Sequence, residues 1–224
     1  MIHIALPCHG RLALTRCALH AIAQTVRESY QVWVVDTDIR PLRHLETARV
    51  QTLEVSRGVE QETGAVANGI KLNAVLAKLP DNAEWFFAMH NDAAPLAPGW
   101  LPWLRTHMGD TPTISFTSSR SVGALYNVPW LRRWRATFAA SPNPGDAIPP
   151  GGLIIPRSPT PWWLHGGEGC RDEAGQLIYA HLGGGTIGAT NRRMPWWLWP
   201  AFVRRELRRN AIARALPRDT WHES

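Results

Sequence analysis

The sequence has 224 residues, of which 45% are hydrophobic and 19% are charged, and this composition excludes a disordered chain because it can form a sizeable core. The length allows one domain or at most two. Three widely spaced cysteines, Cys8, Cys17 and Cys170, form no CxxC pair, which excludes a disulfide scaffold and favours a reducing, cytoplasmic location.

The charge is unevenly distributed along the chain. Residues 1–100 hold 9 basic and 10 acidic side chains, whereas residues 101–224 hold 15 and 8, so the formal net charge of +6 comes from the second half. We expect that half to meet an anion. No export signal is predicted, because His3 and Pro7 interrupt the first apolar run. The apolar stretch 194–203 is about half as long as the ~20 residues of a bilayer span, so no membrane span is expected either.

The first 92 residues alternate between predicted strands and helices. Apolar runs predict strands at 2–7, 31–38 and 84–92 and a weaker strand at 50–55, while helical spacing predicts helices at 12–26 and 64–80. This βαβαβ order favours an α/β fold with a right-handed, doubly wound and mostly parallel sheet flanked by helices.

After residue 92 the alternation weakens. Strands are predicted at 113–119, 151–156 and 176–182, short helices at 100–107 and 129–138, and a Pro- and Gly-rich loop at 141–152. No repeat or linker separates these elements. We therefore predict one domain over residues 1–191, with a basic, Trp- and Arg-rich extension at 192–224 packed on it.

Polar side chains follow two of the predicted strands at the point where each strand ends. Asp36 and Asp38 close one strand, and His90, Asn91 and Asp92 follow another. The carboxyl ends of parallel strands face the ligand crevice of an α/β sheet, and an imidazole and a carboxylate two residues apart can bind one divalent cation. Alternatively, Asp92 caps the following turn and His90 is a surface residue.

Several segments resemble family 2-type glycosyltransferases of the GT-A fold, including small enzymes of viral (phage-type) DNA modification. The main one is AMHNDAAPLAPGWLPWL (88–104), a DxD-like triplet followed by a P-x-x-P-G-W-L segment. Five further segments are similar to family motifs and occur in the family's order: IALPCHGR (4–11), VVDTD (34–38), GAVANGIKLNAVL (64–76), GGLIIPRS (151–158) and RDEAGQLIYAHLGGGT (171–186).

The resemblance implies a nucleotide-sugar donor, with a UDP-type donor favoured, and a Mn²⁺ or Mg²⁺ cofactor that stabilises the departing diphosphate. Asp92 is the implied carboxylate ligand, and His181 is the implied imidazole ligand from the other side. His90 stands where the triplet usually has its first aspartate and is a third candidate ligand. Implied donor-binding residues are Pro7, His9, Arg11, Asp36, Asp38, Asn68, Lys71, His90, Asn91, Gly184 and Gly185.

A catalytic base is needed if an acceptor hydroxyl directly displaces the diphosphate. The family's usual Glu-Asp pair is expected shortly before Arg171, where this sequence has HGGEGCRDE (165–173). Glu168 is the first candidate for the base and Asp172 the second. Alternatively, both are solvated residues, so inversion and retention of the anomeric configuration both stay open.

The basic second half interleaves Trp with Arg. An amphipathic helix is predicted from residue 201, and it can pack on the domain, lie on an anionic membrane or contact nucleic acid through phosphate contacts and base stacking. Candidate acceptor-binding residues are Trp130, Arg133, Trp162, Trp163, Arg192 and Arg193.

These features predict a metal-dependent hexosyltransferase. A hydroxymethylated pyrimidine in DNA is the favoured acceptor, since it combines a nucleophilic hydroxyl with phosphates that arginines can bind. A lipid-linked or cell-envelope glycan is the alternative acceptor. From a different functional class, a catalytically inactive nucleotide-binding module is the alternative to an enzyme, because the triplet and the Glu-Asp pair both depart from the family pattern.

Overall fold

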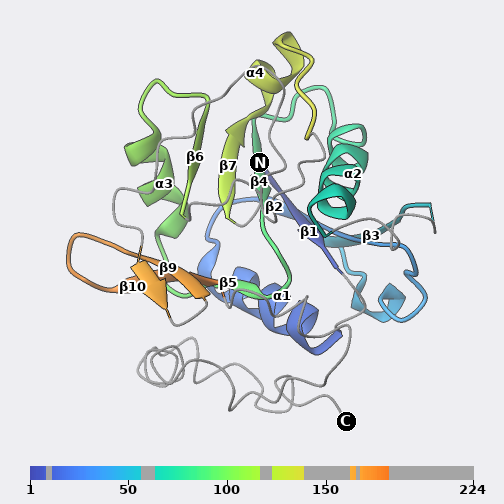
Figure 1. The fold of residues 1–224 in the computed structure, drawn as a ribbon, viewed down its shortest axis with the longest axis horizontal. Helices are drawn as coiled ribbons and strands as arrows, with labels where there is room; N and C mark the ends of the chain where they lie inside the picture. The colour runs from blue at the N-terminus through green and yellow to red at the C-terminus, as the bar shows by residue number, and fades with distance from the viewer. Residues whose placement is uncertain (9–11, 57–63, 117–122, 139–161, 165–166, 182–224) are drawn as a thin grey trace.

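The computed structural model describes residues 1–8, 12–56, 64–116, 123–138, 162–164 and 167–181, and within them a six-stranded sheet forms the centre (Figure 1). Its strand order is β3-β2-β1-β4-β7-β6. The first four of these strands are parallel, β7 is antiparallel to β4, and β6 is antiparallel to β7. The strands are β1 (Ile2–Pro7), β2 (Tyr30–Asp36), β3 (Val50–Glu54), β4 (Trp85–Ala88), β6 (Thr113–Ser115) and β7 (Ala124–Asn127).

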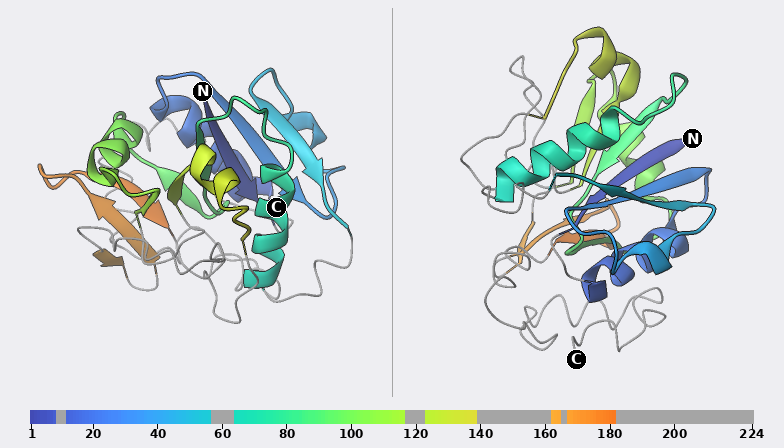
Figure 2. Two further views of the ribbon diagram at one scale, coloured as in Figure 1. Left: turned by 90° about the horizontal axis from the view of Figure 1, so that it is seen from above. Right: turned by 90° about the vertical axis from the view of Figure 1, so that its right-hand side faces the viewer.

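Helices cover both faces of the central sheet, and Figure 2 shows α1 and α2 on opposite sides of it. Every residue of β1 is buried, which explains its continuously apolar sequence. One core joins α1 and α3 to the face that carries Ile4, and a second core joins α2 and α4 to the face that carries Ala5. The helices are α1 (Leu12–Thr25), α2 (Gly64–Leu76), α3 (Trp100–Met108), α4 (Val128–Arg133) and the 3₁₀-helix η1 (Arg43–Leu45).

A second, wholly antiparallel sheet lies below the central one in Figure 1, in the order β5-β10-β9-β8. Its first strand, β5, begins directly after Asp92 and pairs with β10 so that Ala93 lies opposite His181. This pairing brings two segments that are about 90 residues apart in sequence to one place. The strands are β5 (Ala93–Pro95), β8 (Trp162–Leu164), β9 (Gly167–Arg171) and β10 (Leu177–His181).

The predicted fold class is confirmed, and so are the strands and helices expected over the first 92 residues. The helix predicted at 64–80 ends earlier, at Leu76, and the strand predicted at 84–92 ends at Ala88. The sequence analysis did not predict β5, β7, β8 or β9. The strand predicted at 151–156 and the extension at 192–224 lie outside the described residues. Among the helices that are described, none is long and apolar enough to cross a bilayer.

Gly123 is a position where the close packing of the two sheets requires glycine. Its φ is +114°, and a Cβ there would lie 2.6 Å from the Tyr179 ring of β10. We expect Gly123→Ala to lower the free energy of unfolding by about 2 kcal/mol, measured by urea denaturation. Gly175 also has a positive φ but nothing within 4 Å of a built Cβ, so Gly175→Ala should cost less. Equal losses in the two variants would argue against the contact with Tyr179.

Candidate metal and donor site

Three parallel strands of the central sheet end at the same edge and deliver polar groups there. Cys8 follows β1 and donates its backbone N–H to Val35 of β2 at 2.8 Å, while Met89 follows β4 and donates to Ala5 of β1 at 3.1 Å. Asp36 is the last residue of β2 and is buried. The residues that the sequence analysis placed at strand ends therefore lie at one edge of the sheet, as expected for a ligand crevice.

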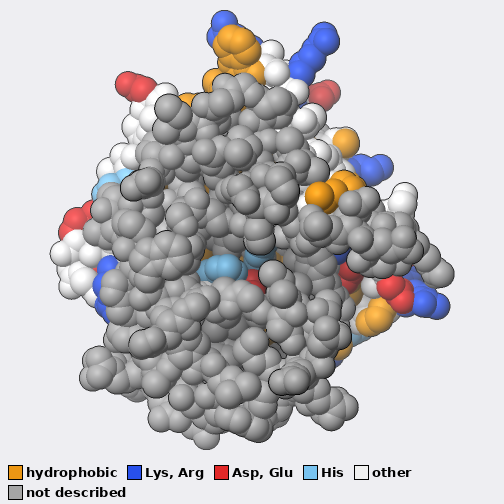
Figure 3. All heavy atoms as spheres, viewed as in Figure 1, with side chains coloured by type: hydrophobic (Ala, Val, Ile, Leu, Met, Phe, Trp, Pro, Cys, Tyr) orange, Lys and Arg blue, Asp and Glu red, His pale blue; other side chains and the backbone are white. Residues whose placement is uncertain are grey.

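Two imidazoles and one carboxylate converge beside this edge. His181 Nε2 lies 3.2 Å from Asp92 Oδ1, and His90 Nδ1 lies 3.8 Å from the same oxygen. One ligand atom from each of the three residues falls within 4.8 Å of the other two. On the face drawn in Figure 3, pale blue histidine atoms and red acidic atoms lie together in a hollow near the centre. The pairing of β5 with β10 explains how His181 reaches the triplet.

The three residues fit a divalent cation. Two donors bound at roughly 2.1 Å to one ion lie about 3 to 4 Å apart, in agreement with the two measured contacts. Asp92 Oδ1 and His181 Nδ1 are buried and make no hydrogen bond within the described part of the chain, which is unusual for buried polar atoms. A bound cation would satisfy that oxygen.

The electrostatics of the cluster keep Asp92 ionised. Burial alone would raise the pKa of this carboxyl, but its contact with the His181 imidazole, together with His90 and its own backbone N–H, outweighs burial and holds the pKa well below its ordinary value. The carboxylate is therefore available as a ligand at neutral pH.

A buried ion pair lies next to the cluster, between the ends of β1 and β2. Lys71 of α2 places its Nζ 3.1 Å from Asp36 Oδ1 and also donates to the Cys8 carbonyl. Both side chains are almost completely buried, with exposed fractions of 2% and 6%. Lys71 thus joins α2 to two strand ends of the site.

Asn91 and Thr15 form a second set of polar contacts beneath the triplet. Asn91 Nδ2 donates to Thr15 Oγ1 at 3.4 Å, and Thr15 Oγ1 lies 3.2 Å from the Cys8 thiol. Burial raises the pKa of that thiol to about 12, so Cys8 is a protonated hydrogen-bonding group and not a nucleophile. The sequence analysis missed Thr15; the one signal for it was a polar residue on the buried face of α1.

The predicted catalytic carboxylates differ in position. Glu168 of β9 lies opposite His181 in the strand register, next to the cluster. Asp172, in contrast, lies in the turn at the other end of the β9–β10 hairpin, where its carboxylate accepts the Gln176 N–H at 2.8 Å. The structure therefore places Asp172 in a turn away from the cluster, whereas Glu168 lies beside it.

The remaining donor-binding predictions divide into three groups. Asn68 reaches the cluster, with its Nδ2 2.9 Å from His90 Nε2, and Pro7 is buried at the end of β1. Asp38 instead forms an exposed ion pair with Arg40, at 2.9 Å and 2.6 Å. His9, Arg11, Gly184 and Gly185 lie outside the described residues.

Two of the predicted acceptor-binding residues lie at the opposite edge of the sheet. Trp130 and Arg133 belong to α4, which follows Asn127, and Asn127 pairs with the first residue of β4 and not with its last. Trp130 packs on the second core, and Arg133 lies over the Trp134 ring. The structure therefore does not bring these two predicted acceptor-binding residues together with the cluster. Trp162 and Trp163 are on β8, and Arg192 and Arg193 are outside the described residues.

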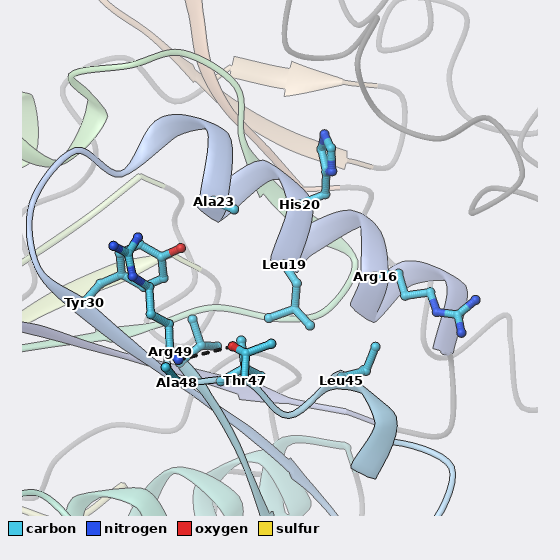
Figure 4. A pocket seen from close by; sticks show the side chains of 11 residues that line it. Arg16, Leu19, His20, Ala23, Tyr30, Leu45, Thr47, Ala48 and Arg49 are labelled. Carbon is cyan, nitrogen blue, oxygen red and sulfur yellow. Dashed lines mark hydrogen bonds between the residues drawn. The ribbon is translucent and has the colours of Figure 1, made fainter.

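A separate pocket of about 540 Å³ lies between α1 and the β2–β3 edge, and the sequence analysis did not predict it. Figure 4 shows Arg49 stacked on Tyr30 at one end and Arg16 at the other, with Leu19 and Ala23 of α1 between them. Among the described residues that line this pocket there is no aspartate or glutamate, so they offer no carboxylate base.

No family model and no curated protein matches the sequence. Among solved structures, the mannosyltransferase PcManGT from Pyrobaculum calidifontis, in complex with GDP-Man and Mn²⁺, is similar with a TM-score of 0.50 and 18% identity, over 65% of this chain and 49% of that chain. The fold is the GT-A fold.

Two further glycosyltransferases show weaker similarity. TarS of S. aureus in complex with UDP-GlcNAc has a TM-score of 0.49 and 14% identity, over 65% of this chain and 51% of that chain. The galactosyltransferase LgtC in complex with donor and acceptor sugar analogs has a TM-score of 0.43 and 12% identity, over 58% of this chain and 59% of that chain. The matched region spans about half the length of the mannosyltransferase and of TarS.

Proposed function

We propose that this protein is a glycosyltransferase that transfers a hexose from a nucleotide-sugar donor to an acceptor hydroxyl, with a divalent cation held by Asp92, His181 and His90. The observation that carries the proposal is the convergence of these three side chains at the carboxyl edge of a GT-A sheet. The mannosyltransferase of similar fold was solved with GDP-Man and Mn²⁺.

The chemistry needs positive charge where the donor bond breaks. When bound, the cation neutralises the charge that develops on the departing diphosphate. Asp92 supplies the negative charge that binds the cation, and its burial keeps water from competing. Lys71 and Asp36 fix the ends of β1 and β2, which support the nucleotide side of the site.

Glu168 is the base that we assign to the acceptor hydroxyl. Its place opposite His181 in the β9–β10 register supports this role, since a base must lie close to the anomeric carbon beside the cation. With a single displacement at that carbon, the configuration of the transferred sugar is inverted.

The nucleotide of the donor is the better supported part of the substrate pair. A UDP-type donor follows from the sequence resemblance, and GDP-type donors belong in the test because of the mannosyltransferase. We propose no DNA acceptor, since Trp130 and Arg133 lie at the other edge of the sheet and no contact of the described residues favours DNA. The lipid-linked or cell-envelope glycan is carried no further either, because no contact of the described residues favours it.

Metal removal provides the test. With Mn²⁺, hydrolysis of at least one UDP- or GDP-sugar is expected, and chelation with EDTA should abolish it until Mn²⁺ is added back. The matching nucleoside diphosphate, at about 100 times its Kd, should raise the melting temperature by about 5 to 10 °C, and only with metal. A shift that is independent of metal, without turnover of any donor, would instead favour the inactive nucleotide-binding module.

A further inference from the structure

We propose that the His90–Asp92–His181 site selects transition-metal ions over Mg²⁺, and that Asn68 is the positioning residue that makes His90 a nitrogen ligand. This inference rests on the metal site of the proposed function. It goes beyond that function by naming the class of ion and a residue that determines it.

The donor set is the first argument. Two imidazoles and one carboxylate offer two nitrogens and one oxygen as ligand atoms. His181 Nε2 lies 3.2 Å from Asp92 Oδ1, and His90 Nδ1 lies 3.8 Å from the same oxygen. Mg²⁺ prefers oxygen ligands and is bound mostly through carboxylates, phosphates and water. Mn²⁺ suits oxygen ligands as Mg²⁺ does, whereas imidazole suits Fe²⁺ and Zn²⁺, and the affinity of such sites rises from Mn²⁺ through Fe²⁺ to Co²⁺. Replacing a carboxylate by His90 therefore weakens Mg²⁺ relative to these ions.

The orientation of His90 is the second argument. Its Nε2 lies 2.9 Å from Asn68 Nδ2, and its other nitrogen, Nδ1, faces Asp92. The carboxamide of Asn68 offers both a donor and an acceptor, and we infer the orientation in which its oxygen faces Nε2 and accepts a proton held there. The proton is then on the nitrogen remote from Asp92, and Nδ1 presents its lone pair to the ion.

The rigidity of this contact is the third argument. Asn68 is 6% exposed and lies on α2, three residues before Lys71, whose buried ion pair fixes the same helix to β1 and β2. The His90 ring is therefore held from a packed helix, and its side chain is only 15% exposed. A fixed ring loses less entropy when it binds an ion than a mobile surface histidine would lose.

Metal titrations of the full chain without any nucleotide test the selectivity directly. Free Mn²⁺ is followed by electron paramagnetic resonance, and Mg²⁺ and Co²⁺ are added as competitors. Co²⁺ should displace Mn²⁺, whereas displacement by Mg²⁺ should require at least about tenfold more ion than displacement by Co²⁺. The visible spectrum of bound Co²⁺ reports nitrogen ligation independently of activity.

Substitution of His90 by a carboxylate is the decisive variant. His90→Asp should lower the preference for Co²⁺ over Mg²⁺ by about tenfold or more, because an oxygen replaces a nitrogen. The His90→Gln variant gives a neutral side chain and should lower the affinity for Co²⁺ without a gain for Mg²⁺. An unchanged preference in His90→Asp would overturn the inference.

Asn68→Ala tests the positioning role. We expect a loss of about 10- to 100-fold in Co²⁺ affinity, with a changed visible spectrum. Asn73→Ala is the control, since Asn73 lies on the same helix and bonds the backbone of Phe138 instead. It should lower the melting temperature and leave Co²⁺ affinity unchanged. Equal Co²⁺ losses in both variants would show a general effect on α2 and contradict positioning by Asn68.

The two proposals fail differently. If donor sugars are turned over but Mg²⁺ displaces Mn²⁺ as readily as Co²⁺ does, the proposed function stands and the selectivity is wrong. If Co²⁺ binds tightly with the expected spectrum but no nucleotide sugar reacts, the selectivity stands and the proposed function is wrong. If none of the ions binds, both are wrong.

Discussion

Asp92→Asn is expected to lower donor turnover by at least about 100-fold, because it removes the negative charge that holds the cation on the diphosphate. Asp92 is the one carboxylate among the three converging side chains. It is also buried between two imidazoles and kept ionised by them. The amide retains the shape of the side chain, so loss of charge is the main change.

His90→Ala should have a smaller effect, because His181 and Asp92 still bind the cation. The loss of donor turnover in His90→Ala should be partly recovered at high Mn²⁺, whereas the loss of turnover in Asp92→Asn should persist. Metal-stimulated hydrolysis of the donor measures both. Asp110→Asn provides the control, as Asp110 is exposed and follows α3 at the opposite edge of the sheet. Mild and equal losses in Asp92→Asn and His90→Ala would place the metal elsewhere.

Much of the fold could be predicted because three strands of the first half, β1, β2 and β4, are largely buried on both faces. The run from Val32 to Val35 is apolar without interruption and is a strand with two covered faces. The short strands of the second sheet carry no such signal. β5 is Ala-Ala-Pro, and its strand geometry depends on pairing with β10 more than 80 residues later. Local propensity cannot indicate a pairing of that kind.

The proposed metal ligands could be predicted from their order along the chain, but their neighbours could not. Asp92 and His181 were identified from the resemblance, and the β5–β10 pairing brings them within 3.2 Å. The ion pair between Asp36 and Lys71 depends instead on the direction in which α2 crosses the sheet. Trp130 and Arg133 had a suggestive composition, yet the antiparallel direction of β7 carries α4 to the opposite edge.

The buried ion pair changes what a substitution at Asp36 would report. From sequence alone, Asp36→Ala would mainly raise the KM for the donor. In the structure, the same substitution also leaves the Lys71 ammonium buried without its carboxylate. A loss of donor binding therefore has to be separated from a loss of folding stability, and the lysine is the better residue with which to measure the latter.

Lys71→Met is expected to lower the free energy of unfolding by about 3 to 5 kcal/mol, the usual cost of removing one partner of a buried pair. Methionine keeps most of the volume of lysine. The loss of stability therefore comes from removal of the ammonium that pairs with Asp36 and from the lost hydrogen bond to the Cys8 carbonyl. Urea denaturation measures it.

Adding Asp36→Asn to Lys71→Met should recover part of the stability, because the remaining buried charge is then removed. Lys78→Met is the matched control at an exposed position just after α2 and should change stability by less than about 0.5 kcal/mol. Equal effects at the two lysines, or no recovery in the double variant, would contradict a charge-paired role for Lys71.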